Sequence, residues 1–249
     1  MDRTILEARQ LVKKYSGRAV VDHINISVGQ RSIVGLLGRN GAGKTTTFRM
    51  IIGMVVPDGG SVIFQGTEVT KLPMYKHARL GMGYLSQEPS VFQHLSVRDN
   101  LRAVLEMMSI TKAECNRRAD LLIERYDLGE VADIQARFLS GGERRKLEVA
   151  RAMITDPSLI LLDEPFSGVD PIVVEEVQAE IRRLVASGIS LLITDHNVER
   201  TLEVADQVYV IDHGKVIGSG PPKEIIQNEL VRKSYLGNIF KGDEFDDHG

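Results

Sequence analysis

The sequence lacks the marks of secreted and membrane-spanning proteins. Among its 249 residues there is no tryptophan and one cysteine, Cys115, which has no partner for an internal disulfide and so fits a reducing compartment. No apolar run approaches the roughly 18 residues that a spanning helix needs. The start of the chain has no apolar core of a signal peptide. We therefore expect a cytoplasmic protein without direct membrane insertion, which meets a membrane only through a partner.

A strong charge of one sign is also missing. The chain has 31 Lys and Arg against 34 Asp and Glu, a net charge of −3, so no basic excess points to a nucleic-acid partner. The six histidines show no metal-ligand spacing, and we interpret all except His196 as surface residues. The hydrophobic share of 43% is enough for one large α/β domain, with or without a small lobe.

The most informative stretch is Gly38–Thr45, which reads G-x-x-x-x-G-K-T, the pattern of a phosphate-binding loop. An apolar run over 32–37 precedes it, and apolar residues at helical spacing follow it. Glycines let backbone N–H groups surround phosphate oxygens, and the following helix directs its positive end at the same place. Lys44 is expected to reach the β- and γ-phosphates, and the Thr45 hydroxyl to bind Mg²⁺. The predicted ATP-binding residues here are Gly38, Arg39, Asn40, Gly41, Ala42, Gly43, Lys44, Thr45 and Thr46.

Two carboxylates follow a second apolar run, Leu159–Leu162. The carboxyl ends of strands are where α/β sheets bind ligands. Asp163 is expected to hold Mg²⁺ through water, and Glu164 to orient or deprotonate an attacking water. Two acids at a strand end also suit a solvated turn, but beside a phosphate loop they favour nucleotide hydrolysis.

A third motif is Leu139–Glu143, L-S-G-G-E, which opens a predicted helix. Ser140 and the amides of Gly141 and Gly142 form a second candidate anion site, and these three residues are also assigned to ATP binding. The simpler interpretation is an N-cap with Ser140 as the capping residue.

The rest of the chain alternates strands and helices around a helical insert. From Ser96 to about Phe138 the sequence pattern is typical of helices, and Ser96 and Thr111 stand at starts that resemble capping boxes. A turn-rich break is expected at 57–60, and Asp170 is expected to cap a helix. Strands are expected within 4–37 and at 61–64, 83–85, 159–162, 191–193, 208–211 and 215–217, and closing helices near 223–227 and 230–235.

In this order, and over nearly the whole length, the motifs resemble those of ATPase subunits of ABC transporters. Gly38–Thr45 is similar to the Walker A loop, Leu139–Glu143 to the signature and Leu159–Asp163 to Walker B. The resemblance implies an α/β P-loop NTPase with a RecA-like core, an antiparallel β subdomain and an inserted helical subdomain. It implies one domain over 1–240, with the helical lobe at about 88–156. The acidic tail at 241–249 is expected to be disordered.

The resemblance also implies roles for residues outside these three motifs. Glu164 holds the catalytic-base position, and His196 matches the switch histidine at the γ-phosphate. Gln87 matches the Q-loop glutamine, which contacts Mg²⁺ and water and signals to the membrane partner. Tyr15 stands where the family places the aromatic that stacks on adenine, and residues 167–170 match the D-loop. Taken alone, Tyr15 suits a half-buried strand position and His196 a satisfied polar residue.

Family resemblance further implies a homodimer. Two subunits sandwich two ATP molecules, and the Walker A loop of one faces the signature of the other. Hydrolysis removes the charge that holds the interface shut, so the dimer opens and drives the transporter.

Longer stretches, such as 83–88 and 162–172, look like the ATPases of lipopolysaccharide exporters in Gram-negative bacteria. This resemblance implies two ATPase copies beneath two integral membrane permease subunits, on the cytoplasmic face of the inner membrane. Phe92 matches an aromatic of the groove that receives the permease. Gln93 and His94 depart from the arginines that exporters tend to carry there.

Three alternatives stay open. The ATPases of branched-chain amino-acid importers share much of the pattern, although Asn197–Val198 after the switch histidine favours export. A non-transport ABC ATPase in DNA repair or translation would usually carry a coiled-coil insertion or two cassettes. A simple P-loop kinase would leave the signature and His196 without a role.

Overall fold

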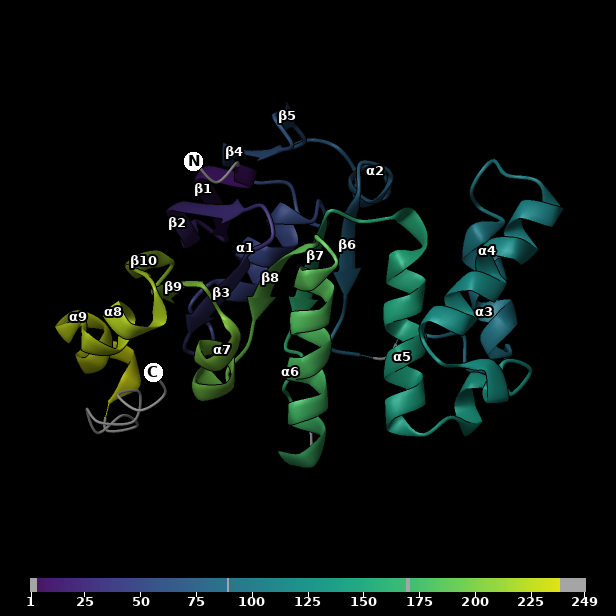
Figure 1. The fold of residues 1–249 in the computed structure, drawn as a ribbon. Helices are drawn as coiled ribbons and strands as arrows, with labels where there is room; N and C mark the ends of the chain where they lie inside the picture. The colour runs from purple at the N-terminus through teal and green to yellow at the C-terminus, as the bar shows by residue number, and fades with distance from the viewer. Residues whose placement is uncertain (1–3, 89, 169–170, 238–249) are drawn as a thin grey trace.

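The computed structural model describes residues 4–88, 90–168 and 171–237, and its strands form two sheets (Figure 1). The larger sheet has six strands in the order β10 (Lys215–Gly220), β9 (Gln207–Asp212), β3 (Ile33–Gly38), β8 (Ser190–Thr194), β7 (Leu159–Asp163) and β6 (Met82–Leu85). The smaller sheet has the order β2 (Arg18–Gly29), β1 (Thr4–Tyr15), β4 (Gly59–Phe64) and β5 (Thr67–Glu68).

The larger sheet is parallel except for β10, which pairs antiparallel with β9. Its central strands are short apolar runs that are buried along their length, as in β3 and β8. Strands buried on both faces need no alternation of polar residues. Because β3 lies beside β8, and β8 beside β7, the carboxyl ends of these three strands meet at one edge.

The helices lie around the sheets and in a lobe to one side. They are α1 (Lys44–Ile51), α2 (Met74–Arg79), α3 (Val97–Leu105), α4 (Lys112–Arg125), α5 (Gly141–Ala152), α6 (Pro171–Ala186), α7 (Val198–Val204), α8 (Pro222–Gln227) and α9 (Glu229–Val231), with short turns η1 (Gly129–Val131), η2 (Ala136–Phe138), η3 (Met153–Thr155) and η4 (Arg232–Leu236). None of the helices in the described ranges is long and apolar enough to cross a membrane.

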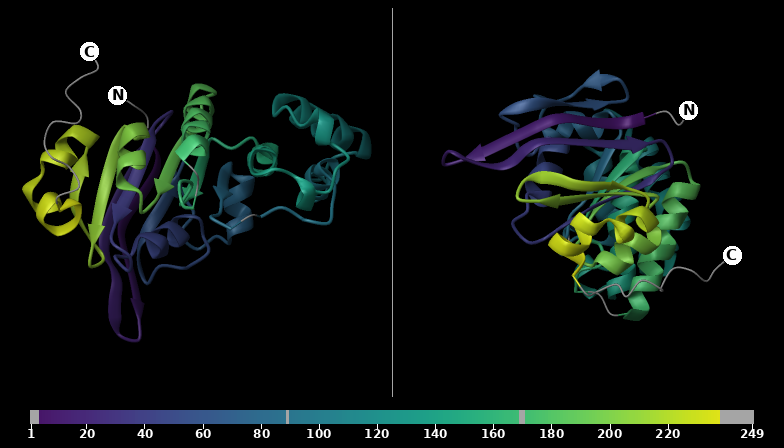
Figure 2. Two further views of the ribbon diagram at one scale, coloured as in Figure 1. Left: turned by 90° about the horizontal axis from the view of Figure 1, so that it is seen from below. Right: turned by 90° about the vertical axis from the view of Figure 1, so that its left-hand side faces the viewer.

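The helical insert predicted from the sequence is confirmed, and it lies between β6 and β7. The side chains of Ser96 and Thr111 accept hydrogen bonds from the backbone N–H groups three residues on, as the capping pattern predicts. Figure 2 shows α3 and α4 standing away from the strands, on the side opposite the C-terminal helices. The lobe contributes to the same apolar cluster as α6 and strands β3, β6, β7, β8 and β9 of the larger sheet.

The turn expected over residues 57–60 is wrong for its last two residues, because strand β4 already begins at Gly59. Gly60 crosses β1 so closely that a Cβ would lie 2.3 Å from the Gln10 carbonyl oxygen. The glycine here permits close strand packing rather than a turn. The expected Asp170 cap and the acidic tail at 241–249 lie outside the described residues.

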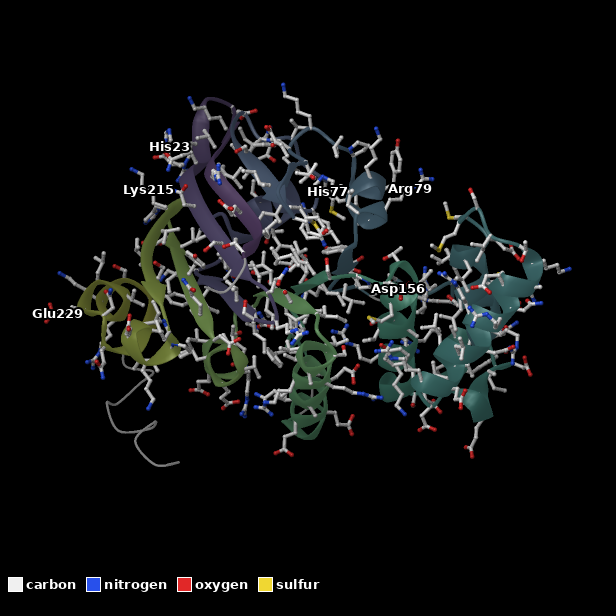
Figure 3. All side chains as sticks on the ribbon, turned by 45° about the horizontal axis from the view of Figure 1, so that its top comes forward. His23, His77, Arg79, Asp156, Lys215 and Glu229 are labelled. Atoms are coloured by element: carbon white, nitrogen blue, oxygen red, sulfur yellow. The ribbon has the colours of Figure 1, made fainter. Side chains whose placement is uncertain are left out.

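The interpretation of His77 as a surface residue is also wrong. His77 is fully buried on α2, and its Nε2 lies 3.1 Å from the carbonyl oxygens of both Val69 and Leu72. Figure 3 shows it among the interior side chains, whereas His23 lies on the outside beside Lys215. Burial lowers the pKa of the His77 imidazole, so the ring is a neutral donor that closes the turn before α2.

Candidate functional site

The predicted phosphate loop joins β3 to α1 at the carboxyl edge of the parallel sheet. Gly38 approaches β9 so closely that a Cβ would lie 2.2 Å from the Ile211 carbonyl oxygen. Gly43, the N-cap of α1, has φ 106°, and a Cβ there would lie 2.6 Å from the Val20 carbonyl oxygen. Only glycine fits both positions, and the free N–H groups of the first turn of α1 open towards the loop as an anion site.

Lys44 folds back over this loop. Its Nζ donates to the carbonyl oxygens of Gly38 at 2.6 Å and Arg39 at 3.1 Å, and the residue is only 5% exposed. Burial lowers the pKa of the Lys44 ammonium, and nearby carboxylates, of which Glu164 acts most strongly, oppose that effect. The Lys44 ammonium is therefore hydrogen-bonded to two uncharged carbonyl oxygens, and the oxygens of a phosphate group can replace them as its partners.

Most other predicted loop residues are accessible. Arg39, Asn40, Gly41 and Thr45 are exposed, Thr46 is half-buried, and Ala42 and Gly43 are buried. Thr47 donates its hydroxyl to the Gly43 carbonyl oxygen at 2.9 Å. The Thr47 hydroxyl is therefore committed to the helix, and Thr45 is the most exposed of the three threonines.

The two carboxylates at the end of β7 lie in different settings. Asp163 accepts a hydrogen bond from the Tyr84 hydroxyl at 3.1 Å, and burial raises the pKa of its carboxyl. Glu164 adopts a left-handed backbone conformation, φ 49°, fixed by its N–H donating to the Thr194 carbonyl oxygen at 2.7 Å. This bond ties the end of β7 to the end of β8.

His196 lies beside the candidate base. Its Nδ1 is 3.4 Å from Glu164 Oε2 and 3.6 Å from Asp195 Oδ1. The fully buried Asp195 accepts backbone hydrogen bonds from Phe166 and Asn197, both at 2.8 Å, and burial raises the pKa of its carboxyl. Asp195 therefore fixes the loop after Glu164 against the loop that carries His196.

Gln87 follows the end of β6 and turns towards the same loop. Its Nε2 donates to Ser167 Oγ at 3.2 Å, and the side chain is exposed. Within the described ranges, no hydrogen bond joins Gln87 to Asp163 or Thr45. The structure thus brings Gln87 to the segment after the candidate base rather than directly to the candidate metal ligands.

The signature residues stand apart from the phosphate loop. Ser140 caps α5 in a complete capping box, in which its hydroxyl accepts from the Glu143 N–H and the Glu143 carboxylate accepts from the Ser140 N–H. Ser140, Gly141 and Gly142 are exposed, and in the described part of the chain no hydrogen bond connects them to residues 38–45. The N-cap interpretation is therefore confirmed, and the exposed helix start stays available to a second molecule.

Tyr15 ends β1 at the tip of the β1–β2 hairpin, where it pairs with Arg18. Its side chain is 48% exposed, and Lys13 Nζ lies 5.7 Å from the ring centroid. Tyr15 lies on a strand, as the half-buried strand interpretation expects, and about half of its surface is open to solvent, so a ligand can reach the residue. The same hairpin reaches the phosphate loop through Val20, whose carbonyl lies against Gly43.

Replacing Tyr15 with alanine should weaken ATP binding about 5- to 150-fold, since base–aromatic stacking is worth about 1–3 kcal/mol. Titration with a fluorescent ATP analogue measures the affinity. Tyr75→Ala is the matched control, because Tyr75 is also exposed and also has a basic neighbour, Arg79, 5.6 Å from its ring centroid. Equal affinity in the two variants would contradict the stacking role.

Phe92 lies in the loop that leads to α3. It is 48% exposed, and the guanidinium of Arg151, from α5, lies 4.6 Å from its ring centroid. The side-chain amide of Asn100 holds this loop by accepting from Phe92 N at 2.8 Å. The aromatic ring is thus accessible to solvent on a loop that Asn100 and Arg151 hold in place.

Two site residues were missed by sequence reasoning. Asp195 directly precedes His196 and follows an apolar strand, so its position in the sequence could have identified it as a residue of the site. Tyr84 could not be identified in this way, because its contact with Asp163 joins residues 79 positions apart.

Comparisons with known proteins identify the family of the chain. Residues 21–167 match the protein family described as ABC transporter. The chain is 48% identical to the lipopolysaccharide export system ATP-binding protein LptB of Acidithiobacillus ferridurans, over 95% of this chain and 98% of that protein. It is 47% identical to the protein of the same name from Escherichia coli (strain K12), again over 95% and 98%.

Solved structures show the same fold. An ATP-binding cassette of an ABC transporter in its ADP conformation superposes with a TM-score of 0.84 at 26% identity, covering 94% of this chain and 99% of that chain. The cbiO1 protein from Clostridium perfringens, part of an ABC transporter complex, gives a TM-score of 0.82 at 27% identity, covering 95% and 96%. Together with the phosphate loop and the paired carboxylates, these matches show that the chain belongs to the family of ABC transporter ATP-binding proteins.

Proposed function

We propose that this chain is the ATP-hydrolysing subunit of a lipopolysaccharide exporter and powers extraction of lipopolysaccharide from the inner membrane. The observation that carries the proposal is the near full-length likeness to exporter ATPases, which extends beyond the motifs common to all ABC proteins. An ATPase subunit of this family converts hydrolysis into movement of a membrane partner.

The site supports a direct attack of water on the γ-phosphorus. The Glu164 carboxylate takes a proton from the water as the new oxygen–phosphorus bond forms and the bond to ADP breaks, which leaves ADP and inorganic phosphate. His196, 3.4 Å from Glu164, orients the attacking water and donates to a γ-phosphate oxygen. Lys44 and the first-turn amides of α1 stabilise the negative charge on the phosphates.

Mg²⁺ is the proposed cofactor, bound together with ATP, and it neutralises phosphate charge. The proposed ligands are the exposed Thr45 hydroxyl, Asp163 and Gln87, all with the oxygen atoms that Mg²⁺ prefers. In the part of the chain that the structure describes, no three or more acidic, histidine or cysteine side chains are arranged so that they alone could hold a metal ion. A site with so few protein ligands suits Mg²⁺, which keeps several waters and binds through substrate phosphates.

The working form is proposed to be a homodimer with two composite sites. Ser140, Gly141 and Gly142 open an exposed, capped helix that has no bond to the phosphate loop of its own chain. In the dimer this helix start meets the γ-phosphate held by the partner subunit, so each site needs both chains.

The proposed partners are two integral membrane permease subunits, and the dimer lies on the cytoplasmic face of the inner membrane, in peripheral contact through them. Phe92 is the proposed docking residue, because its ring is exposed and its loop is held by Arg151 and Asn100. Nucleic acid is not expected as a partner, since the net charge is −3.

The test is an affinity pull-down of the full chain from its native membranes, with identification of the co-purifying proteins. We expect two membrane subunits with large periplasmic domains, together with bound lipopolysaccharide. Phe92→Ala should lower their recovery, whereas Leu121→Ala should not, although Leu121 is equally exposed at 49% on α4. Recovery of a compact permease pair and a periplasmic amino-acid-binding protein would instead assign the chain to import.

A further inference from the structure

Tyr84 lies in β6, at one edge of the larger sheet and beside β7 (Figure 1). The two strands run parallel, with Tyr84 opposite Leu161 and Leu85 opposite Leu162. Side chains of paired residues lie on the same face of a sheet, and so do side chains two residues apart in one strand. Tyr84, Leu161 and Asp163 therefore share one face of the sheet.

This shared face is the one that α1 covers. Leu161 belongs to the same apolar cluster as Phe48 of α1, and Tyr84 packs against that cluster. The rings of Tyr84 and Phe48 have centroids 6.2 Å apart and an interplanar angle of 56°. Helix α1 follows the phosphate loop and begins with Lys44 at the carboxyl edge of the sheet. Asp163, the last residue of β7, thus lies at the same edge and on the same face as the start of α1.

The Tyr84 hydroxyl donates to Asp163 Oδ2 at 3.1 Å. Within the ranges that the structure describes, no other hydrogen bond and no ion pair reaches this carboxylate. The last torsion of an aspartate side chain has broad minima, so the carboxylate takes a definite orientation only where a partner holds it. Because the ring of Tyr84 is packed against Phe48, its hydroxyl is such a partner. It holds one carboxylate oxygen and leaves Oδ1 for a ligand.

We propose that Tyr84 is a positioning residue for the metal site: its hydroxyl holds Asp163 Oδ2, so that Oδ1 stays available to Mg²⁺ or to a water bound to it. This inference rests on the proposed function of Asp163 as a Mg²⁺ ligand. Mg²⁺ requires a nearly regular octahedral arrangement, so the orientation of each ligand affects its binding. A phenol suits the role because it donates one proton and adds no positive charge that would repel the cation.

The test is Tyr84→Phe in the full-length chain, which removes the hydroxyl and keeps the ring against Phe48. Binding of a fluorescent ATP analogue is titrated with Mg²⁺, and every protein in the series carries Glu164→Gln to suppress hydrolysis. The Mg²⁺ concentration at half-maximal binding should rise about tenfold, because hydrogen-bond partners of metal ligands typically contribute 10- to 100-fold to metal affinity. Affinity for the analogue in EDTA should be unchanged, because the hydroxyl acts on the metal ligand and not on the nucleotide.

A double-mutant cycle with Asp163→Asn separates this role from the metal site itself. Asp163→Asn should raise the Mg²⁺ concentration at half-maximal binding, and adding Tyr84→Phe should raise it no further, because the hydroxyl acts through the carboxylate. A normal Mg²⁺ response in Asp163→Asn would refute the proposed metal site. A normal response in Tyr84→Phe beside an altered one in Asp163→Asn would overturn the role of Tyr84 and leave the metal site intact.

Tyr209→Phe is the matched control. Tyr209 is also on a strand of the larger sheet, and its hydroxyl accepts from the Ser27 N–H at 3.2 Å in the smaller sheet. Its loss should leave the Mg²⁺ response unchanged. A purely structural role of the Tyr84 hydroxyl predicts an equal loss of affinity with Mg²⁺ and in EDTA, and that result would also overturn the proposal.

Discussion

Replacing Glu164 with glutamine should leave ATP bound and reduce its hydrolysis about 100- to 10,000-fold, the usual contribution of a general base. The glutamine keeps the shape of the side chain and the backbone bond from residue 164 to the Thr194 carbonyl oxygen. It loses the basic carboxylate that lies 3.4 Å from His196 Nδ1. ATP that cannot be cleaved keeps its γ-phosphate charge, so the composite sites stay shut and the closed dimer accumulates.

Phosphate release measures the hydrolysis, and light scattering after size-exclusion chromatography measures the mass with and without ATP. The variant should elute at twice the monomer mass only when ATP is present. Glu130→Gln, an exposed change in the helical lobe, is the control and should hydrolyse ATP like the unaltered protein. Rapid turnover in Glu164→Gln would remove Glu164 from the role of base, and a lack of ATP-dependent dimer would contradict the composite site.

The sequence was informative where function depends on residues that are close together in the chain. The phosphate loop needs glycines at fixed positions between a buried strand and a helix, and the structure has β3, the loop and α1 in that arrangement. Asp163 and Glu164 follow the last residues of an apolar strand, so their place at the ligand-binding edge could be predicted. The capping box at Ser140 is likewise a local pattern with a local structure.

Contacts between distant segments could not be predicted in this way. The bond from Tyr84 to Asp163 joins residues 79 positions apart and depends on the pairing of β6 with β7. His77 was placed wrongly because nothing around it in the sequence shows that the carbonyls of Val69 and Leu72 converge on its ring.

Lys44 and the neighbouring carboxylates balance one another's charge at the carboxyl edge of the sheet. Burial lowers the pKa of the Lys44 ammonium, and the Glu164, Asp195 and Asp163 carboxylates act in the opposite direction. At neutral pH the lysine therefore serves as their counter-ion until a nucleotide brings its own negative charge. Entry of Mg²⁺ with ATP then supplies positive charge to the same edge.

Replacing Lys44 with alanine should consequently weaken ATP binding about 10- to 150-fold, because charge-assisted hydrogen bonds contribute about 1.5–3 kcal/mol. The variant also leaves the Gly38 carbonyl without its 2.6 Å donor and the carboxylates without their counter-ion, so it should melt at a lower temperature without nucleotide. Isothermal titration with ATP measures the affinity, and Lys71→Ala, an exposed change between β5 and α2, controls for loss of a positive charge. Wild-type affinity in Lys44→Ala would contradict the phosphate-loop assignment. A loss of turnover with unchanged affinity would restrict Lys44 to stabilising the transition state.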